Sequence, residues 1–141
     1  MRAPAQKSGG SCKIAIAGAG KMAREHVRAF ADVPGVKLAG IWNRTRSHAE
    51  ALAADFGIPT VCDSIAELYQ RTKADLVVIA VLETAANAVA RACFDFPWAV
   101  FMEKPPGLNL PDARDIQAAA RAKKRCVHVA LNRRFLSSTL A

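Results

Sequence analysis

Residues 13–23 read KIAIAGAGKMA, a short apolar run that ends in glycine and leads into a glycine-spaced turn. The run is typical of a buried β-strand, and the apolar spacing of Met22 to Val33 predicts a helix directly after it. Gly18, Gly20 and Ala23 satisfy the pattern GxGxxG/A at this junction. In that pattern the first glycine permits a tight turn, the second lets the backbone approach a pyrophosphate, and a small third residue lets the helix pack closely on the sheet.

The same alternation of strand and helix continues to residue 130, which indicates a parallel sheet with crossover helices. We expect strands at 13–18, 36–43, 60–62, 74–81, 98–102 and 125–130, and helices at 22–33, 47–57, 63–72, 84–94 and 110–123. The run 74–81 is the most apolar and shows no alternation, as expected of a central strand covered on both faces. The sequence therefore predicts an α/β fold, a single three-layer α/β/α domain with a doubly wound parallel sheet of the Rossmann type.

Capping residues mark the start of two of these helices. Ser47 is the expected N-cap of the second helix, with Glu50 three residues on and Gly57 as its stop. For the third helix, Asp63 or Ser64 can cap, and Glu67 stands where a capping box with Ser64 needs it.

Composition and charge restrict the classes of function. The chain has 141 residues, the size of one domain, and its formal net charge is +8. The densest basic run, Arg121 to Arg125, follows a helical pattern, so we interpret it as cations on the last turn of a helix rather than a nucleic-acid site. Residues 1–11 read as a flexible tail without an apolar signal segment, and the apolar stretch Leu76 to Leu82 is too short to span a membrane. We therefore expect a cytoplasmic protein with no nucleic-acid or membrane partner.

The cysteines and histidines show no metal-ligand spacing, so we expect no metal. The four cysteines are widely separated and lie in or beside apolar segments, and we interpret them as reduced core thiols. These four residues are Cys12, Cys62, Cys93 and Cys126.

The glycine pattern predicts a dinucleotide site. The loop Gly18, Ala19, Gly20, Lys21 and Met22 should present backbone amides and a helix N-terminus to the phosphates, although a tight turn without a ligand is the alternative. An acidic residue at the end of the second strand would favour NAD, because it accepts hydrogen bonds from the adenosine ribose.

The end of the second strand carries no such acidic residue. The positions there hold Asn43, Arg44, Thr45 and Arg46. No carboxylate repels a 2′-phosphate and two guanidiniums could bind one, so we expect NADP to be preferred over NAD. The alternative is that Arg44 and Arg46 are ordinary surface cations of a basic protein.

An ordered set of motifs resembles the nucleotide-binding half of the glucose-fructose oxidoreductase, inositol dehydrogenase and MocA-like (Gfo/Idh/MocA) family. The resemblance covers about Lys13 to Leu136. Its motifs are KIAIAGAGKMA at 13–23, NRTRSHAEALAADFGIP at 43–59, ADLVVIAV at 74–81, EKP at 103–105 and NRRF at 132–135. The resemblance implies the cofactor half of an enzyme that passes hydride between a nicotinamide and a hydroxyl-bearing carbon, commonly of a sugar or polyol.

The family also implies roles for single residues. Lys104 would orient or polarise the reacting hydroxyl, with a possible acid/base role, and would lie close to the cofactor; the proline after it is often cis. Glu103 would lie near the nicotinamide ribose, and Ala80, Val81 and Arg134 would contribute further cofactor contacts. Without the family, residues 103–106 would read as an exposed charged pair before a rigid turn.

Two departures from the family pattern concern activity. Val81, Leu82 and Ala86 stand where members often have Thr-Pro and His, which weakens the case for nicotinamide contacts in that loop. A substrate domain would begin near Arg134, so residues 12–136 are the expected NAD(P)-binding domain and 137–141 the start of a second domain of which the sequence contains no more. We expect little turnover by this chain alone. A non-catalytic dinucleotide-binding or interaction module, completed by a partner or self-associated as a homo-oligomer, is the alternative.

Overall fold

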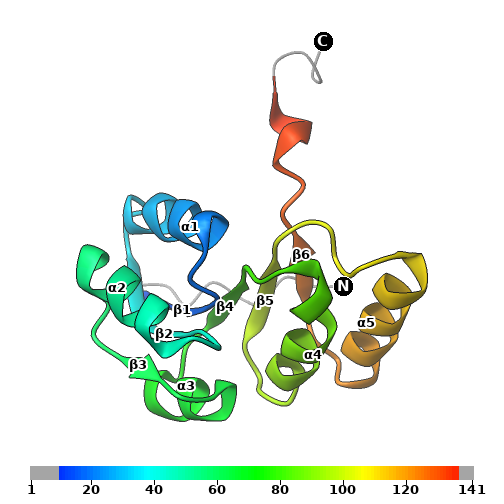
Figure 1. Cartoon of the computed structure of the whole chain (residues 1–141), viewed down its shortest axis with the longest axis horizontal. Coiled ribbons are helices and arrows are strands. Elements are labelled where there is room, and N and C mark those ends of the chain that lie inside the picture. Colours follow the sequence, from blue (N-terminus) through cyan, green and yellow to red (C-terminus); the bar gives the residue numbers. More distant parts are fainter. Residues whose placement is uncertain (1–9, 137–141) are drawn as a thin grey trace.

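A computed structural model describes residues 10–136, which form one parallel six-stranded sheet with helices on both faces (Figure 1). The strands are β1 (Cys12–Ala17), β2 (Val36–Trp42), β3 (Val61–Cys62), β4 (Leu76–Ile79), β5 (Ala99–Met102) and β6 (Val127–Val129). The helices are α1 (Lys21–Ala31), α2 (Arg46–Phe56), α3 (Ile65–Thr72), α4 (Glu83–Phe94) and α5 (Leu110–Ala122), followed by the short 3-10 helix η1 (Asn132–Phe135). Within the described residues, the predicted six strands, five helices and doubly wound fold class are confirmed.

The order of the strands creates a switch point between β1 and β4. The sheet runs β3-β2-β1-β4-β5-β6, so the first half of the chain builds outward from β1 and the second half builds outward from β4 in the opposite direction. All the pairings are parallel. The carboxyl ends of the strands therefore share one edge, where a doubly wound sheet binds its ligands.

Alternating residues of the central strands build two apolar layers. Ile14, Ile16 and Val78 pack against α1 and α2 on one face. Ala15 and Val77 point to the other face, into a cluster with residues of α3, α4 and α5. Small alanines on β1 let the helices of this second layer approach the sheet closely.

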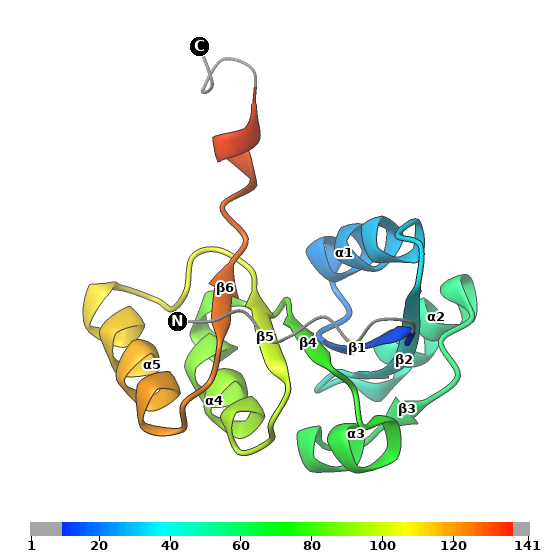
Figure 2. The same cartoon turned by 180° about the vertical axis from the view of Figure 1, so that it is seen from behind.

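Within residues 10–136, helices cover only one of the two faces of β5 and β6. On one face, Val100 and Met102 of β5 share an apolar cluster with residues of α4 and α5, whereas Figure 2 shows the opposite face of β5 and β6 with no helix of the described chain in front of it. Phe101 on that face is half-buried and His128 is exposed. Phe101 is sheltered by α1 through edge-on ring contacts with His26 and Phe30.

The capping predictions are half right. Ser64 caps α3, since its Oγ accepts from the Glu67 N–H at 3.0 Å, and Glu67 accepts in turn from the backbone of Asp63 at 2.7 Å. The prediction for Ser47 is wrong. α2 begins at Arg46 after Thr45, which is the N-cap in an extended conformation, so Ser47 already lies inside the first turn. Gly57 ends α2 in the left-handed conformation, as expected.

The basic run 121–125 only partly matches its interpretation. Arg121 lies in the last turn of α5, but Lys123 is the C-cap and Lys124 and Arg125 lie beyond it. Lys123 pairs with Asp95 at 3.1 Å, and the Arg125 guanidinium donates to the Phe94 carbonyl at 2.8 Å. The end of the run therefore ties α5 to α4.

The interpretation of all four cysteines as core thiols is wrong for two of them. Cys62 and Cys93 are buried, whereas Cys12 is exposed at the start of the first strand and Cys126 is half-buried. Burial raises the pKa of the Cys93 thiol. The four cysteines are free.

Other expectations concern absences or lie outside the described residues. No helix within residues 10–136 is long and apolar enough to cross a membrane, and this range holds no group of three or more His, Cys, Asp or Glu that could bind a metal. Most of the expected tail (1–11) and all of segment 137–141 lie outside the part of the chain that the structure describes.

Gly18 fixes the distance between the two halves of the sheet at the switch point. Its φ of +122° is strained for any L side chain, and a Cβ at this position would lie 2.1 Å from the carbonyl oxygen of Ala80. Gly20, two residues on, has an ordinary φ of −82°. Apart from Gly20 itself and its two chain neighbours, no described residue has an atom within 4 Å of the position of a Cβ there.

We expect these two glycines to respond differently to the same substitution. Gly18→Ala should lower the free energy of unfolding by at least about 2 kcal/mol, because backbone must move to relieve the overlap. Gly20→Ala should change it by less than about 1 kcal/mol. Urea unfolding of both variants measures the difference, and equal effects would contradict the assigned roles.

Candidate functional site

A row of backbone hydrogen bonds holds the ends of the strands together at the carboxyl edge. The Gly18 N–H donates to Trp42, that of Ala80 to Ala17, and that of Glu103 to Ile79, at 2.8, 2.9 and 2.8 Å. These bonds extend the ladders just beyond the last strand residues. The glycine loop, the end of β2, the Ala80 segment and the start of the EKP segment are therefore fixed side by side.

The glycine loop leaves the N-terminus of α1 open. Gly20 is the N-cap and has no side chain to accept from the amides of Lys21, Met22 and Ala23, and the first turn of α1 contains no acidic residue. By contrast, α3 and α5 begin with side-chain caps from Ser64 and Asn109. An uncapped helix N-terminus beside an open glycine is a site that can accept phosphate oxygens.

The segment after β2 is a tight turn in which the guanidinium of Arg46 is paired and that of Arg44 pairs with no described residue. The Asn43 amide donates to the Thr45 carbonyl at 2.9 Å, which fixes the turn. Arg44 is exposed, and its side chain makes no hydrogen bond or ion pair within residues 10–136. Arg46 instead pairs with Glu50 and Asp63. The hydrogen bond to Asp63, and then that to Glu50, raises the pKa of Arg46 above its ordinary value.

Glu103 forms a pair that the sequence did not indicate. Its Oε2 lies 2.5 Å from Nε2 of His26 on α1, and the two side chains are only 12% and 15% exposed. The His26 ring also makes an edge-on contact with Phe101, at 5.4 Å between centroids. His26 therefore connects α1 to the end of β5, and Glu103 faces α1.

Lys104 stands at the start of an exposed loop. The Lys104–Pro105 bond is cis, as the resemblance implies. The far end of the loop is held by Asp112 of α5, whose carboxylate accepts from the Leu108 N–H at 2.7 Å and from the Asn87 amide of α4 at 2.6 Å. Lys104 itself is exposed and its ammonium has no described partner.

The loop after β4 only partly fits the cofactor contacts that were predicted for Ala80 and Val81. Ala80 is buried against Gly18, and Val81 is half-buried. Leu82 is 70% exposed and is the N-cap of α4 without any side-chain cap. Ala86, where family members often have histidine, is buried in the core. This loop can therefore offer a ligand backbone groups and apolar contact only.

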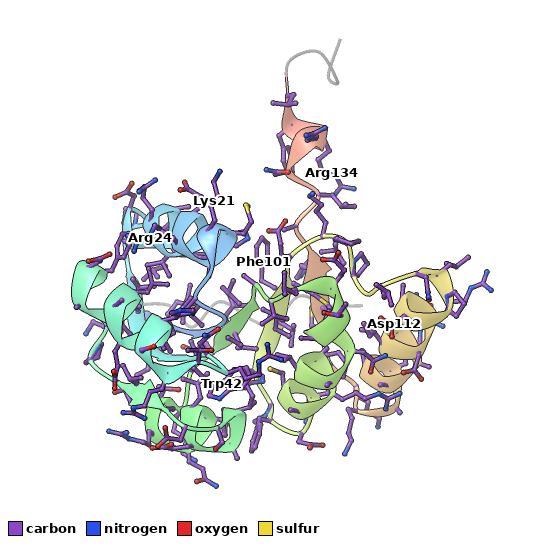
Figure 3. All side chains as sticks on the ribbon, in the orientation of Figure 1. Lys21, Arg24, Trp42, Phe101, Asp112 and Arg134 are labelled. Atoms are coloured by element: carbon purple, nitrogen blue, oxygen red, sulfur yellow. The ribbon has the colours of Figure 1, made fainter. Side chains whose placement is uncertain are left out.

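A cavity of about 510 Å³ lies between α1 and the segment that follows β6. Its lining includes Met22, His26, Phe101, Glu103 and Arg134. Figure 3 shows Lys21 at the start of α1 and Arg134 on the projecting η1, with Phe101 of β5 between these two elements. The structure thus brings Met22, Glu103 and Arg134 around one space, while the loop 43–46 lies beyond β1.

Local motifs indicated most of these residues, but pairs distant in sequence were missed. Sequence reasoning found no role for His26 or Asp112, and it gave Asp63 only a possible role as a helix cap. His26 and Glu103 are 77 residues apart, and Arg46 and Asp63 are 17 residues apart in neighbouring crossovers. The position of Asp63 directly after a predicted strand was an available indication that this residue lies at the carboxyl edge.

Three comparisons with known proteins bear on this arrangement. A family model described as "Oxidoreductase family, NAD-binding Rossmann fold" matches residues 12–131. The Salmonella typhimurium protein YceM, named as an oxidoreductase, is 31% identical over 124 residues, which are 87% of this chain and 39% of that protein.

Solved structures share the fold. A structure from Desulfitobacterium hafniense, described as an NADPH-dependent oxidoreductase, superimposes with a TM-score of 0.86 at 19% identity, over 94% of this chain and 38% of the other. Myo-inositol dehydrogenase from Lactobacillus casei, in complex with NAD(H) and myo-inositol, gives 0.81 at 24% identity, over 89% and 38%. The chain thus spans about two fifths of the length of these relatives.

The His26–Glu103 pair predicts a loss of stability when its donor is removed. His26→Phe keeps an aromatic ring beside Phe101 but leaves the mostly buried Glu103 carboxylate without its partner, which should cost about 1–3 kcal/mol. His26→Gln keeps a donor and should recover at least part of the loss. Urea unfolding of the two variants measures the pair, and an unchanged stability of His26→Phe would show that the contact contributes nothing.

Proposed function

The chain belongs to the oxidoreductase family with an NAD-binding Rossmann fold, and on that premise we propose that it is the cofactor-binding half of a nicotinamide-dependent oxidoreductase. The substrate would carry a hydroxyl or carbonyl carbon, as in a sugar, a polyol or a related small molecule. Myo-inositol, bound in the Lactobacillus casei structure, is one compound of that class.

The open N-terminus of α1 carries this proposal. Gly18 brings β1 against β4, and Gly20 leaves room in front of the amides of Lys21 and Met22. A pyrophosphate there would receive backbone hydrogen bonds and the positive end of the helix dipole. The adenosine would extend toward Asn43 and Thr45, and the nicotinamide toward Ala80, Val81 and Glu103, as in other doubly wound sheets.

Lys104 supplies the group that would act on the substrate. It is exposed at the carboxyl edge, immediately after Glu103. The bound nicotinamide would supply the hydride chemistry. The Lys104 ammonium would donate a hydrogen bond to the substrate oxygen and so orient the carbon that exchanges hydride. Arg134, across the cavity from Met22, would assist the cofactor from η1.

The cofactor choice rests on Arg44. Asn43 brings no negative charge to the ribose, and Arg44 is exposed and without a described partner, so NADP should bind somewhat more tightly than NAD. The two solved relatives carry different cofactor descriptions, NADPH-dependent in one and NAD(H)-bound in the other. A modest preference is therefore proposed, and both dinucleotides should bind.

A non-catalytic dinucleotide-binding module is the second candidate. It is favoured by Val81, Leu82 and Ala86 in the loop after β4, where members of the family often have Thr-Pro and His. In that case the exposed Leu131 and Phe135 would face a partner or a second copy of the chain. The cytoplasmic location and the oligomeric state stay predictions.

Gly20→Asp tests the dinucleotide site directly. The carboxylate would fill the space left for the pyrophosphate and repel it, so affinity for both NAD and NADP should fall at least about 100-fold. Asp is also a good N-cap, so the free energy of unfolding should stay the same or rise. Isothermal titration calorimetry measures the affinities and urea unfolding the stability. Unchanged affinity would contradict the site, as would a native chain that binds neither nucleotide at millimolar concentration.

Lys104→Met tests the catalytic assignment in a form of the protein that includes a substrate domain. Loss of the ammonium should lower kcat at least about 100-fold, as for other positioned donors, while the dissociation constant for the dinucleotide changes less than about threefold. Steady-state kinetics and a cofactor titration separate the two effects. Unchanged turnover would make Lys104 a structural residue of the loop.

A further inference from the structure

The residue that follows β3 lies beside the residue that follows β2. Trp42 and Cys62 are register partners at the ends of these strands. Asn43 and Asp63 are therefore neighbours on the carboxyl edge, about one strand spacing apart. The end of β2 lacks an acidic residue, but the adjacent strand places a carboxylate at the same level.

Asp63 is held firmly in this position. Its N–H donates to Glu67 at 2.7 Å, and its carbonyl accepts from the Trp42 indole at 3.3 Å. The next residue, Ser64, is the N-cap of α3. Backbone anchors on both sides fix where the Asp63 carboxylate stands, although its side chain is 72% exposed.

The carboxylate of Asp63 binds the guanidinium of Arg46, which Glu50 also engages at 2.8 Å from the far side. Arg46 can grip a 2′-phosphate with its paired donors only if it leaves Asp63. The two arginines and two carboxylates around this turn sum to no net charge. A 2′-hydroxyl can donate to a carboxylate, whereas a 2′-phosphate is repelled by it.

Building on the proposed function, we propose that Asp63 is a specificity-determining residue for the dinucleotide: it withholds Arg46 from the 2′-phosphate and supplies the negative charge that the end of β2 lacks. Arg44 then acts alone in favour of NADP. The preference stays small, and NAD remains a good ligand.

Removing the carboxylate should release Arg46. In Asp63→Ala, and in the similarly shaped Asp63→Asn, affinity for NADP should rise about tenfold, the scale expected for one unit charge removed from the neighbourhood of the phosphate. Affinity for NAD should stay within about threefold. The gain should shrink at high salt, because these charges are exposed.

Isothermal titration calorimetry of the native chain and its variants with NADP and NAD tests this assignment. Affinity for 2′-AMP should rise in Asp63→Ala as affinity for NADP does, while affinity for 5′-AMP should change as little as that for NAD. These two compounds contain only the adenosine end of the cofactor. Asp63→Ala combined with Arg46→Ala should lose the gain. Asp95→Asn is a matched control, because it also removes one negative charge from a surface ion pair, here with Lys123. Asp95 lies before β5, at the edge of the sheet opposite the carboxyl edge. This variant should change the affinity for NADP and for NAD by no more than about twofold.

The outcomes separate the two proposals. A ratio of NADP to NAD affinity that rises in Asp63→Ala but not in the double variant supports the role of Asp63. An unchanged ratio in a chain that binds both nucleotides overturns that role and leaves the proposed function intact. A native chain that binds neither nucleotide overturns both.

Discussion

The close approach of β1 to β4 at Gly18 is the constraint on which the rest of the molecule depends. A side chain there would overlap the Ala80 carbonyl, so only glycine allows the two half-sheets to meet and the chain to turn into α1. The row of backbone hydrogen bonds along the carboxyl edge begins at this point. The segments that carry the candidate site residues are joined to this junction by those bonds.

The helices differ in whether a side chain caps their N-terminal amides. α3 and α5 are closed by the side chains of Ser64 and Asn109, whereas α1 begins on a bare glycine. The capped helices α3 and α5 hold the scaffold, whereas the N-terminus of α1 presents unpaired amides at the glycine loop. Two carboxylates also hold segments at the carboxyl edge: Asp63 binds Arg46 after β2, and Asp112 accepts from the Leu108 N–H after β5.

Local pattern was sufficient for the fold and for the place of the glycine loop within it. The period of the apolar residues and the glycine spacing of 18–23 predicted the strands, the switch from strand to helix and the glycine loop at the start of α1. The start of α2 was misplaced because the chain enters the helix at Arg46, one residue before Ser47, without any side-chain cap that a local pattern could reveal. The pairs His26–Glu103 and Arg46–Asp63 depend on which crossovers lie side by side, and no local pattern encodes that.

The two tryptophans of the chain occupy contrasting surroundings. Trp98 is 2% exposed, and its indole donates to the Cys93 carbonyl at 2.7 Å inside the core. Trp42 is half-buried at the carboxyl edge of the sheet, next to Asn43, and its indole donates to the Asp63 carbonyl. Emission from Trp98 would report loss of the core, and emission from Trp42 would report binding of the proposed dinucleotide at the carboxyl edge. Replacing either indole by phenylalanine would therefore give a chain with a single optical reporter, for unfolding in one case and for occupancy in the other.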